Sequence, residues 1–247
     1  MMKLGKTPAR PGAVTFKLVD YLTALPKPPT TFGHETLIPT WGMNGNDAVG
    51  DCVIASKAHL IEMWNAEAGR PVVVTTKDSL ADYSAITGYD PTDPNSDQGT
   101  DMSVAASYFR KTGYRDSAGT RHKIGAYLSI TPGNWSEHLQ ALYLFGAVEI
   151  GINFPASAMA QFNAGKEWSY NSRSKIEGGH CIPLVAHRTP QSLTCVTWGA
   201  LERMTPRFFT AFNDESLVYL SPEMLTGGRS PEGFNLAQLQ ADLSQLH

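Results

Sequence analysis

The chain has 247 residues, of which 42% are hydrophobic and 17% charged, and its formal net charge is −3. This length is enough for a substantial core in one large or two small domains, and the composition is typical of a soluble globular protein. The weak net charge, without any block of like charges, disfavours nucleic acid as the main partner, because phosphate binding requires a concentrated basic face.

The first part of the chain, residues 1–40, is rich in proline and has only one short periodic segment. We expect it to form an arm that lies along the following domain. It lacks the continuous apolar stretch of a signal peptide, and no segment of the chain approaches the roughly 20 apolar residues that span a bilayer. These features predict a cytoplasmic or virion-associated protein with neither a signal peptide nor a transmembrane segment, and no membrane partner.

The middle of the chain predicts helices, because apolar residues recur at helical spacing and a glycine follows each segment. The predicted helices cover 52–69, 77–87, 101–112 and 134–146. Asp51, Asp101 and Asn134 are the expected N-caps, and Glu137 completes a capping-box pattern after Asn134.

After Gly146 the pattern changes to short β-branched or apolar runs separated by turns. The predicted strands cover 147–154, 181–186, 193–198 and 216–220. Helices followed by strands indicate an α+β protein, in which the cleft between a helical half and a sheet half is a common place for an active site. The tail, 221–247, carries leucines at helical spacing, which predicts a C-terminal helix that either docks on the domain or forms a homo-oligomer.

The segment 41–55 places Cys52 at the first turn of a helix, directly after a glycine-containing loop. The unsatisfied N–H groups and the positive end of the helix dipole favour a thiolate at that position. A candidate partner is His180, which follows two glycines at the start of a predicted strand. The alternatives for these residues are a small buried cysteine and a hydrogen-bonded structural histidine.

These segments resemble the papain-like cysteine peptidases. His180 follows Cys52 by 128 residues, close to the interval of about 130–150 residues between the two catalytic residues of that family. Further similar segments occur in the family's order, and together they cover about 40–220. They are Asn46, at the place of a Gln that donates to the oxyanion; 98–101, like the glycine-bearing wall of the cleft; 146–152, like the strand "GPVSVAI"; 162–168, like the turn after it; and 197–199, like "SWG".

The resemblance implies a papain-like two-lobed α+β fold, with a helical lobe over 41–145, an antiparallel β-sheet or barrel lobe over 146–220 and the active-site cleft between them. It also implies that Cys52 attacks a peptide carbonyl while His180 forms an ion pair with the thiolate and then protonates the leaving amine.

The resemblance implies roles for several other residues. The backbone N–H of Cys52 and the side chain of Asn46 would stabilise the oxyanion, and loss of such a donor typically costs about 100- to 1000-fold in turnover. Trp198 would shield the histidine from water. The substrate cleft would be lined by Gln98, Gly99 and Gly179.

The sequence departs from the family pattern at informative positions. Val196 stands where the family has the Asn that orients the histidine, and Thr197 beside it is a substitute whose side chain is expected on the opposite face of the strand. Asn213 is another candidate. Asp51 places an anion beside the nucleophile unless its carboxylate caps the helix, and Pro183 suggests a strand that lies at a sheet edge or is bulged. With only about 40 residues before the motif, a long inhibitory prosegment is not expected.

Other polar residues give weaker indications of function. Cys181 and Cys195 are expected to be packing residues, with a disulfide between them as the lesser possibility, because an odd number of cysteines makes a poor disulfide framework. Asp93, Asn95 and Asp97 resemble the start of a calcium loop, but the required glycine and final glutamate are absent, so an acidic turn is expected. The histidines show no metal-ligand spacing, and neither a metal nor a cofactor is predicted.

The leading hypothesis is a cysteine peptidase that acts on peptide or protein substrates through an acyl-thioester. Two alternatives remain open. One is a papain-fold protein with weak or no catalysis, used as a binding or structural component, for example of a phage particle. The other is a peptidoglycan-directed amidase or endopeptidase.

Overall fold

The computed structural model describes residues 2–20 and 27–224. Within these residues the α-helices are α1 (Cys52–Glu67), α2 (Thr76–Thr87), α3 (Met102–Lys111), α4 (Trp135–Phe145), α5 (Ala156–Asn163) and α6 (Pro206–Phe212). The strands are β1 (Phe32–Gly33), β2 (Tyr114–Arg115), β3 (Arg121–His122), β4 (Ala126–Ser129), β5 (Val148–Pro155), β6 (Ile176–Thr189), β7 (Ser192–Thr197), β8 (Ala200–Met204) and β9 (Asn213–Leu220). None of the helices in this part of the chain combines the length and the apolar character that a bilayer crossing requires.

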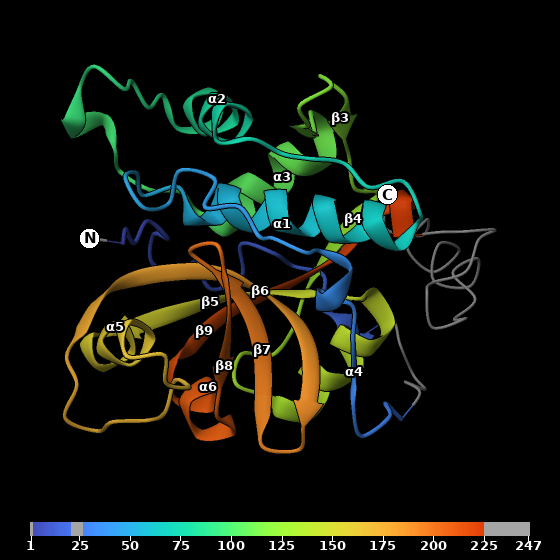
Figure 1. Cartoon of the computed structure of the whole chain (residues 1–247), viewed down its shortest axis with the longest axis vertical. Helices are drawn as coiled ribbons and strands as arrows, with labels where there is room; N and C mark the ends of the chain where they lie inside the picture. Colours follow the sequence, from blue (N-terminus) through green and yellow to red (C-terminus); the bar gives the residue numbers. More distant parts are fainter. Residues whose placement is uncertain (1, 21–26, 225–247) are drawn as a thin grey trace.

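A seven-stranded antiparallel sheet forms one half of the molecule. Its strand order is β4-β9-β5-β6-β7-β8, and β1 pairs with β6 outside this path. The sheet is open, so the predicted antiparallel sheet is present but a closed barrel is not. In Figure 1, α1, α2 and α3 lie together on one side of the sheet, whereas α4, α5 and α6 accompany the strands. The α+β, two-lobed architecture predicted from the sequence is therefore confirmed.

Helix α1 is the central element between the two halves. Its residues from Cys52 to Asn65 are all buried, including the charged Lys57 and Glu62. A helix that is buried on every side lies in the middle of the core rather than on its surface. Its longest contact with the sheet is along β6, and this packing sets Cys52 beside the strand that carries His180.

The caps expected for the later helices are formed. Asp101 accepts a hydrogen bond from the N–H of Val104, and Asn134 accepts one from the N–H of Glu137. The predicted cap at Asp51 is wrong, because its side chain makes no capping hydrogen bond at the start of α1. The first turn of helix α1 is instead stabilised by its tertiary packing rather than by a side-chain cap.

The chain contains several elements that periodicity did not predict, namely α5, α6, β8 and the short strands β1 to β4. Most of them are short, and short elements give little periodic signal. Strand β6 is longer than the predicted 181–186, and it is an inner strand with β5 on one side and β7 on the other. Pro183 is therefore not at an edge. It lies directly before Leu184, where the pairing with β7 begins and then shifts register.

The C-terminal helix predicted from the leucines of the tail lies beyond Met224, outside the described residues. Before it, a 3₁₀ turn, Pro222–Met224, packs against α1. The three cysteines, all within the described part, are free and buried, so the alternative of a disulfide between Cys181 and Cys195 is not realised.

Candidate active site

Cys52 is the first residue of α1 and is almost fully buried, with 1% of its surface exposed. Its position at the amino end of a helix exposes the sulfur to the unpaired N–H groups of the first turn. His180 lies on β6, also with 1% exposure, and pairs with Ile152 of β5. The two side chains line one small cavity of about 10 Å³, which is close to the space of a single water molecule.

The imidazole of His180 is held by a hydrogen bond on one side and by ring stacking on its face. Its Nε2 atom hydrogen-bonds to the hydroxyl of Thr197 at 2.8 Å. The ring stacks on the indole of Trp198, with centroids 4.5 Å apart and planes 17° from parallel. Trp198 has a φ of 45°, an uncommon value for a non-glycine residue, and it ends β7 in a turn that brings the indole over the histidine. The Thr197 side chain thus faces the imidazole, contrary to the strand-alternation argument.

The other ring nitrogen, Nδ1 of His180, is buried and has no hydrogen-bond partner among the described residues. Buried polar atoms are rarely left in this state, and the exceptions concentrate at functional positions. Val196 also lines the cavity but offers no acceptor. Asn213, the other candidate orienter, instead donates to the backbone of Gly151 and Glu215.

The remaining predicted residues are divided between the cavity and the groove beside it. Asn46 lines the cavity, and its amide nitrogen donates to the carbonyl of Val49 at 3.1 Å, which leaves a second N–H. Gly99 and Gly179 line a groove of about 520 Å³ together with residues 4–8. Gln98 also lines this groove, and its amide nitrogen donates to the carbonyl of Asn95 at 2.6 Å.

The N-terminal segment lies between the two walls of the cleft that carry Gly99 and Gly179. Residues 3–7, here called the N-terminal strand, enter between the lobes and are seen as the dark blue trace between α1 and the sheet (Figure 1). The N–H of Lys6 donates to the carbonyl of Gly179 at 3.0 Å. On the other side, the Thr100 N–H donates to Gly5 at 2.7 Å and the Thr100 carbonyl accepts from Thr7 at 3.0 Å. The strand therefore pairs with both walls of the cleft.

Glycines make room for this strand. A Cβ atom on Gly5 would lie 1.7 Å from the carbonyl oxygen of Gly50, and one on Gly99 would lie 2.1 Å from the oxygen of Gly5. A Cβ on Gly179 would lie 2.3 Å from the oxygen of Lys6. All three distances are far below van der Waals contact, so the walls and the strand fit only because these positions lack side chains.

Burial of Cys52 and His180 determines their protonation states. Burial raises the pKa of the Cys52 thiol to about 12, although backbone groups of Cys181 and Gly5 act in the opposite direction. Burial lowers the pKa of His180 to about 3. Desolvation disfavours the charged form of each group, so the closed cleft holds a neutral thiol and a neutral imidazole rather than an ion pair.

Asp51 is fully buried, and neither of its carboxyl oxygens has a hydrogen-bond partner at ordinary distance in the described part of the chain, although the side chain of Asn46 is near enough to act against the rise of its pKa. Burial raises its pKa well above the usual value. An ionised Asp51 would also raise the pKa of the neighbouring Cys52. A protonated Asp51 is therefore compatible with a reactive thiol, whereas a charged one opposes it.

Two parts of the site were not predicted from the sequence. They are the N-terminal strand in the cleft and the carboxylates of Asp214 and Glu215, which receive the side chain of Lys6. In the sequence, Asp214 and Glu215 directly precede the predicted strand 216–220, but Lys6, with which they pair, lies 208 residues from Asp214. No group of metal-ligating side chains occurs within residues 2–20 and 27–224.

No protein-family model matches the sequence, and none of the curated proteins shows a significant sequence match. Among solved structures, xylellain, a cysteine protease from Xylella fastidiosa, superposes with a TM-score of 0.65 at 13% identity, over 89% of this chain and 96% of xylellain. Digestive procathepsin L 3 of Tenebrio molitor larval midgut gives 0.61 at 14% identity, over 89% and 76% of the two chains. Procathepsin B S9 from Trypanosoma congolense gives 0.57 at 11%, over 89% and 86%. This chain thus has the two-lobed fold of the papain-like cysteine proteases.

Proposed function

We propose that the protein is a cysteine peptidase whose cleft is closed by its own N-terminal strand. The observation that carries the proposal is the shared cavity of Cys52 and His180, with Thr197 on one ring nitrogen and the other ring nitrogen unpaired. His59, which lines the same cavity, also has an Nδ1 atom without a partner among the described residues, so this feature alone does not mark a reactive ring. His180 differs in that its other nitrogen is held by the Thr197 hydroxyl, and it lines the cavity together with the thiol at the helix tip.

Departure of the N-terminal strand would admit water to both groups. The desolvation that holds their pKa values apart would then fall, so the thiol would lose its proton to Nδ1 of His180 and form a thiolate–imidazolium pair. The hydrogen bond from Thr197 and the stacked Trp198 would hold the ring in place, in the role that the missing Asn at Val196 would otherwise fill.

The thiolate would then attack the carbonyl carbon of a peptide bond. The N–H of Cys52 and the side-chain amide of Asn46 would bind the oxyanion, and the imidazolium would protonate the leaving amine. Water, deprotonated by the neutral imidazole, would hydrolyse the acyl-thioester and restore the thiol. The substrates of this reaction are peptides or proteins, and neither nucleic acid, a membrane nor a cofactor takes part.

The N-terminal strand would block the nucleophile in this arrangement. The backbone of Gly5 acts to lower the pKa of the Cys52 thiol, against the effect of burial, which is consistent with a strand that lies beside the sulfur. The burial of both reactive groups also favours one alternative, a papain-fold protein that has kept the scaffold but uses it for binding.

Thiol labelling separates these functions. In the full chain, Gly5→Val places a side chain against the Gly50 carbonyl and expels the N-terminal strand. We expect iodoacetamide to label Cys52 slowly in the wild type and at least about 10-fold faster in the variant, including at mildly acidic pH, since a paired thiolate persists there. Peptide hydrolysis should appear in the same variant and disappear in Gly5→Val/Cys52→Ser.

Cys181 and Cys195 serve as internal controls, because both are buried in the sheet and should label slowly in either protein. Cys181 also lines the cavity of Cys52, whereas Cys195 does not, so Cys195 is the stricter control. If Cys52 of the opened variant labels no faster than these two and no peptide is cleaved, the chain is a binding or structural member of the fold and the peptidase proposal fails.

A further inference from the structure

The side chain of Lys6 fills a pocket in the β-lobe wall of the cleft. Its ammonium lies 3.0 Å from a carboxylate oxygen of Asp214 and 3.9 Å from one of Glu215, and the whole side chain has 0% exposure. It also donates to the carbonyl of Thr7 at 3.1 Å. Lysine is almost never fully buried unless it is paired, and in this pocket the two carboxylates pair with its ammonium group.

The shape of the pocket depends on Gly151 of β5. A Cβ atom there would lie 2.0 Å from Cε of Lys6, so the aliphatic stem passes directly over the glycine. We call this site, formed by Gly151, Asp214 and Glu215, the lysine pocket. Its walls fit a long unbranched chain and its floor fits a positive charge.

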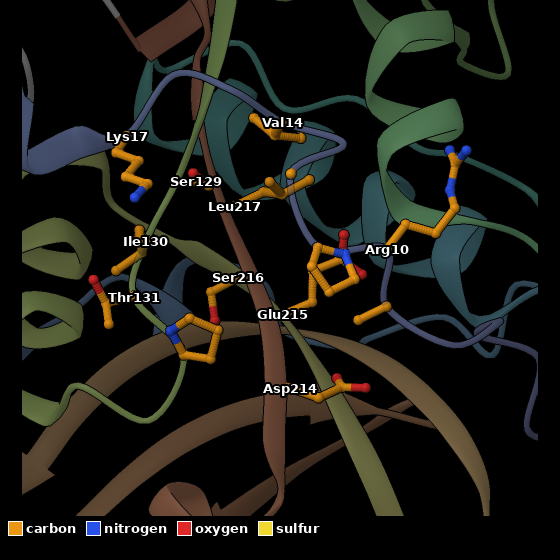
Figure 2. Close-up of a pocket in the computed structure, with 14 residues that line it drawn as sticks. Arg10, Val14, Lys17, Ser129, Ile130, Thr131, Asp214, Glu215, Ser216 and Leu217 are labelled. Atoms are coloured by element: carbon orange, nitrogen blue, oxygen red, sulfur yellow. The ribbon is translucent and has the colours of Figure 1, made fainter.

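The two carboxyl groups of the floor are not sealed from solvent. Asp214 and Glu215 keep about 16% and 15% of their side-chain surface exposed. They also line a cavity of about 420 Å³ together with Arg10 and Val14, and Figure 2 shows these residues around it. Solvent access through this cavity limits the desolvation of the carboxyl groups, and a cation that enters the emptied pocket would favour the ionised form of Glu215.

The lysine pocket adjoins the reacting groups. Lys6 pairs through its backbone with Gly179, the residue directly before His180, and follows Gly5, whose backbone faces Cys52. A peptide in the cleft that hydrogen-bonds to Gly179 in the same way would direct a side chain into this pocket. Burial raises the pKa of Glu215 to about 7, and the charge of Lys6 acts against that rise, so a cation in the pocket favours the ionised form of this carboxyl group.

We propose that the lysine pocket is the specificity site of the cleft, that it selects peptides carrying a lysine or arginine side chain at this position, and that Lys6 is its internal occupant. This inference rests on the proposed function for its role in catalysis, but the recognition of a basic side chain can be measured without any turnover.

The test uses the full chain with Lys6→Glu, in which a carboxylate opposes Asp214 and Glu215 and the N-terminal strand leaves the cleft. Lys3→Glu is the matched control, because it makes the same charge change at an exposed position of the same strand. The probe is a fluorescein-labelled peptide with the sequence of residues 3–8. It is compared with peptides in which norleucine or glutamate replaces the lysine that corresponds to Lys6. Binding is followed by fluorescence anisotropy.

We expect the lysine peptide to bind Lys6→Glu roughly 10- to 100-fold more tightly than the norleucine peptide, the weight of one charge-assisted hydrogen bond. The glutamate peptide should not bind. The preference should disappear in Lys6→Glu/Asp214→Asn/Glu215→Gln, and Lys3→Glu should bind all peptides weakly because its pocket is still filled. If Lys6→Glu does not fold, Lys6→Ser empties the pocket without reversing the charge.

Equal binding of the lysine and norleucine peptides, or binding of neither, would overturn the lysine pocket. The outcome for catalysis is independent. Selective binding of the lysine peptide by a protein that cleaves nothing and labels slowly at Cys52 would support the pocket and refute the peptidase, whereas cleavage without basic preference would do the reverse.

Discussion

The ion pair between Lys57 and Glu149 joins the helix that carries Cys52 to the sheet that carries His180. The Lys57 ammonium lies 2.5 Å from both carboxylate oxygens, and both side chains have 0% exposure. The Tyr219 hydroxyl donates to the same carboxylate at 2.5 Å, and its ring lies 5.0 Å from the ammonium. The pair is thus satisfied on all sides and sealed from water.

Substitution of Lys57 by Met removes the cation and keeps most of the volume. Glu149 is then a buried carboxylate with Tyr219 as its remaining donor. Breaking a buried pair in this way typically costs about 3–5 kcal/mol, because the charge that remains is uncompensated. We therefore expect the free energy of unfolding of Lys57→Met to fall by about that amount. In Lys57→Met/Glu149→Gln the charge is gone and the Gln oxygen still accepts from Tyr219, so most of the loss should be recovered.

Urea unfolding, followed by tryptophan fluorescence and circular dichroism at pH 7, measures both variants and Glu149→Gln alone. The double-mutant cycle should show a coupling energy of at least about 2 kcal/mol. Additive effects, or a loss below about 1 kcal/mol for Lys57→Met, would refute the reasoning, because they would mean that water reaches the pair or that the carboxylate finds another partner.

Three further outcomes follow from the site. In the Gly5→Val background, Thr197→Val should lower kcat about 10- to 100-fold with little change in KM, because the ring of His180 loses its hydrogen bond. Thr197→Ser in the same background should keep most of the rate. A similar loss of rate in the serine variant would contradict a positioning role for the Thr197 hydroxyl. Asp51→Asn should raise the free energy of unfolding at pH 7 but not at pH 3. The pKa of Asp51 is raised in the folded state, so stability declines as pH rises above the pKa of the unfolded state, and Asn removes that decline. Urea midpoints at the two pH values measure the effect, and an equal gain at both would contradict this explanation. His122 is the opposite case: burial would lower its pKa, but the carboxylates on both ring nitrogens raise it. Its stabilisation is therefore complete below the unfolded pKa of about 6.5 and lost as pH rises through the folded value, so His122→Gln should lower the Tm more at pH 5.5 than at pH 8.5.

The helix after Cys52 and the run of strands after Gly146 were predictable, because their signals are local: apolar periodicity, turn glycines and caps such as Asp101 and Asn134. The spacing of Cys52 and His180 placed both residues at one cleft through resemblance alone, and the structure brings them to one cavity. Short elements such as α6 and the strand β8 escaped prediction for the opposite reason, since a few residues carry little periodic signal.

Strand alternation assigned Thr197 to the wrong face. Thr197 is the last residue of β7, directly before the left-handed backbone of Trp198, and its hydroxyl lies 2.8 Å from Nε2 of His180. Asp51 misled in a related way: a residue suited to capping lies at the cap position, but the packing of α1 on all sides leaves its carboxyl group without a partner.

The amino-acid sequence by itself determined the order of helices and strands, the reactive residue types and their separation along the chain. Only the tertiary structure decided what lies between the two walls of the cleft and how deeply the reactive groups are buried. The contact between Lys6 and Asp214 joins residues 208 positions apart, and the burial that holds Cys52 and His180 neutral comes from the packing of helix α1 against the sheet. Burial and long-range pairing depend on how distant segments pack, and no local pattern of residues encodes them.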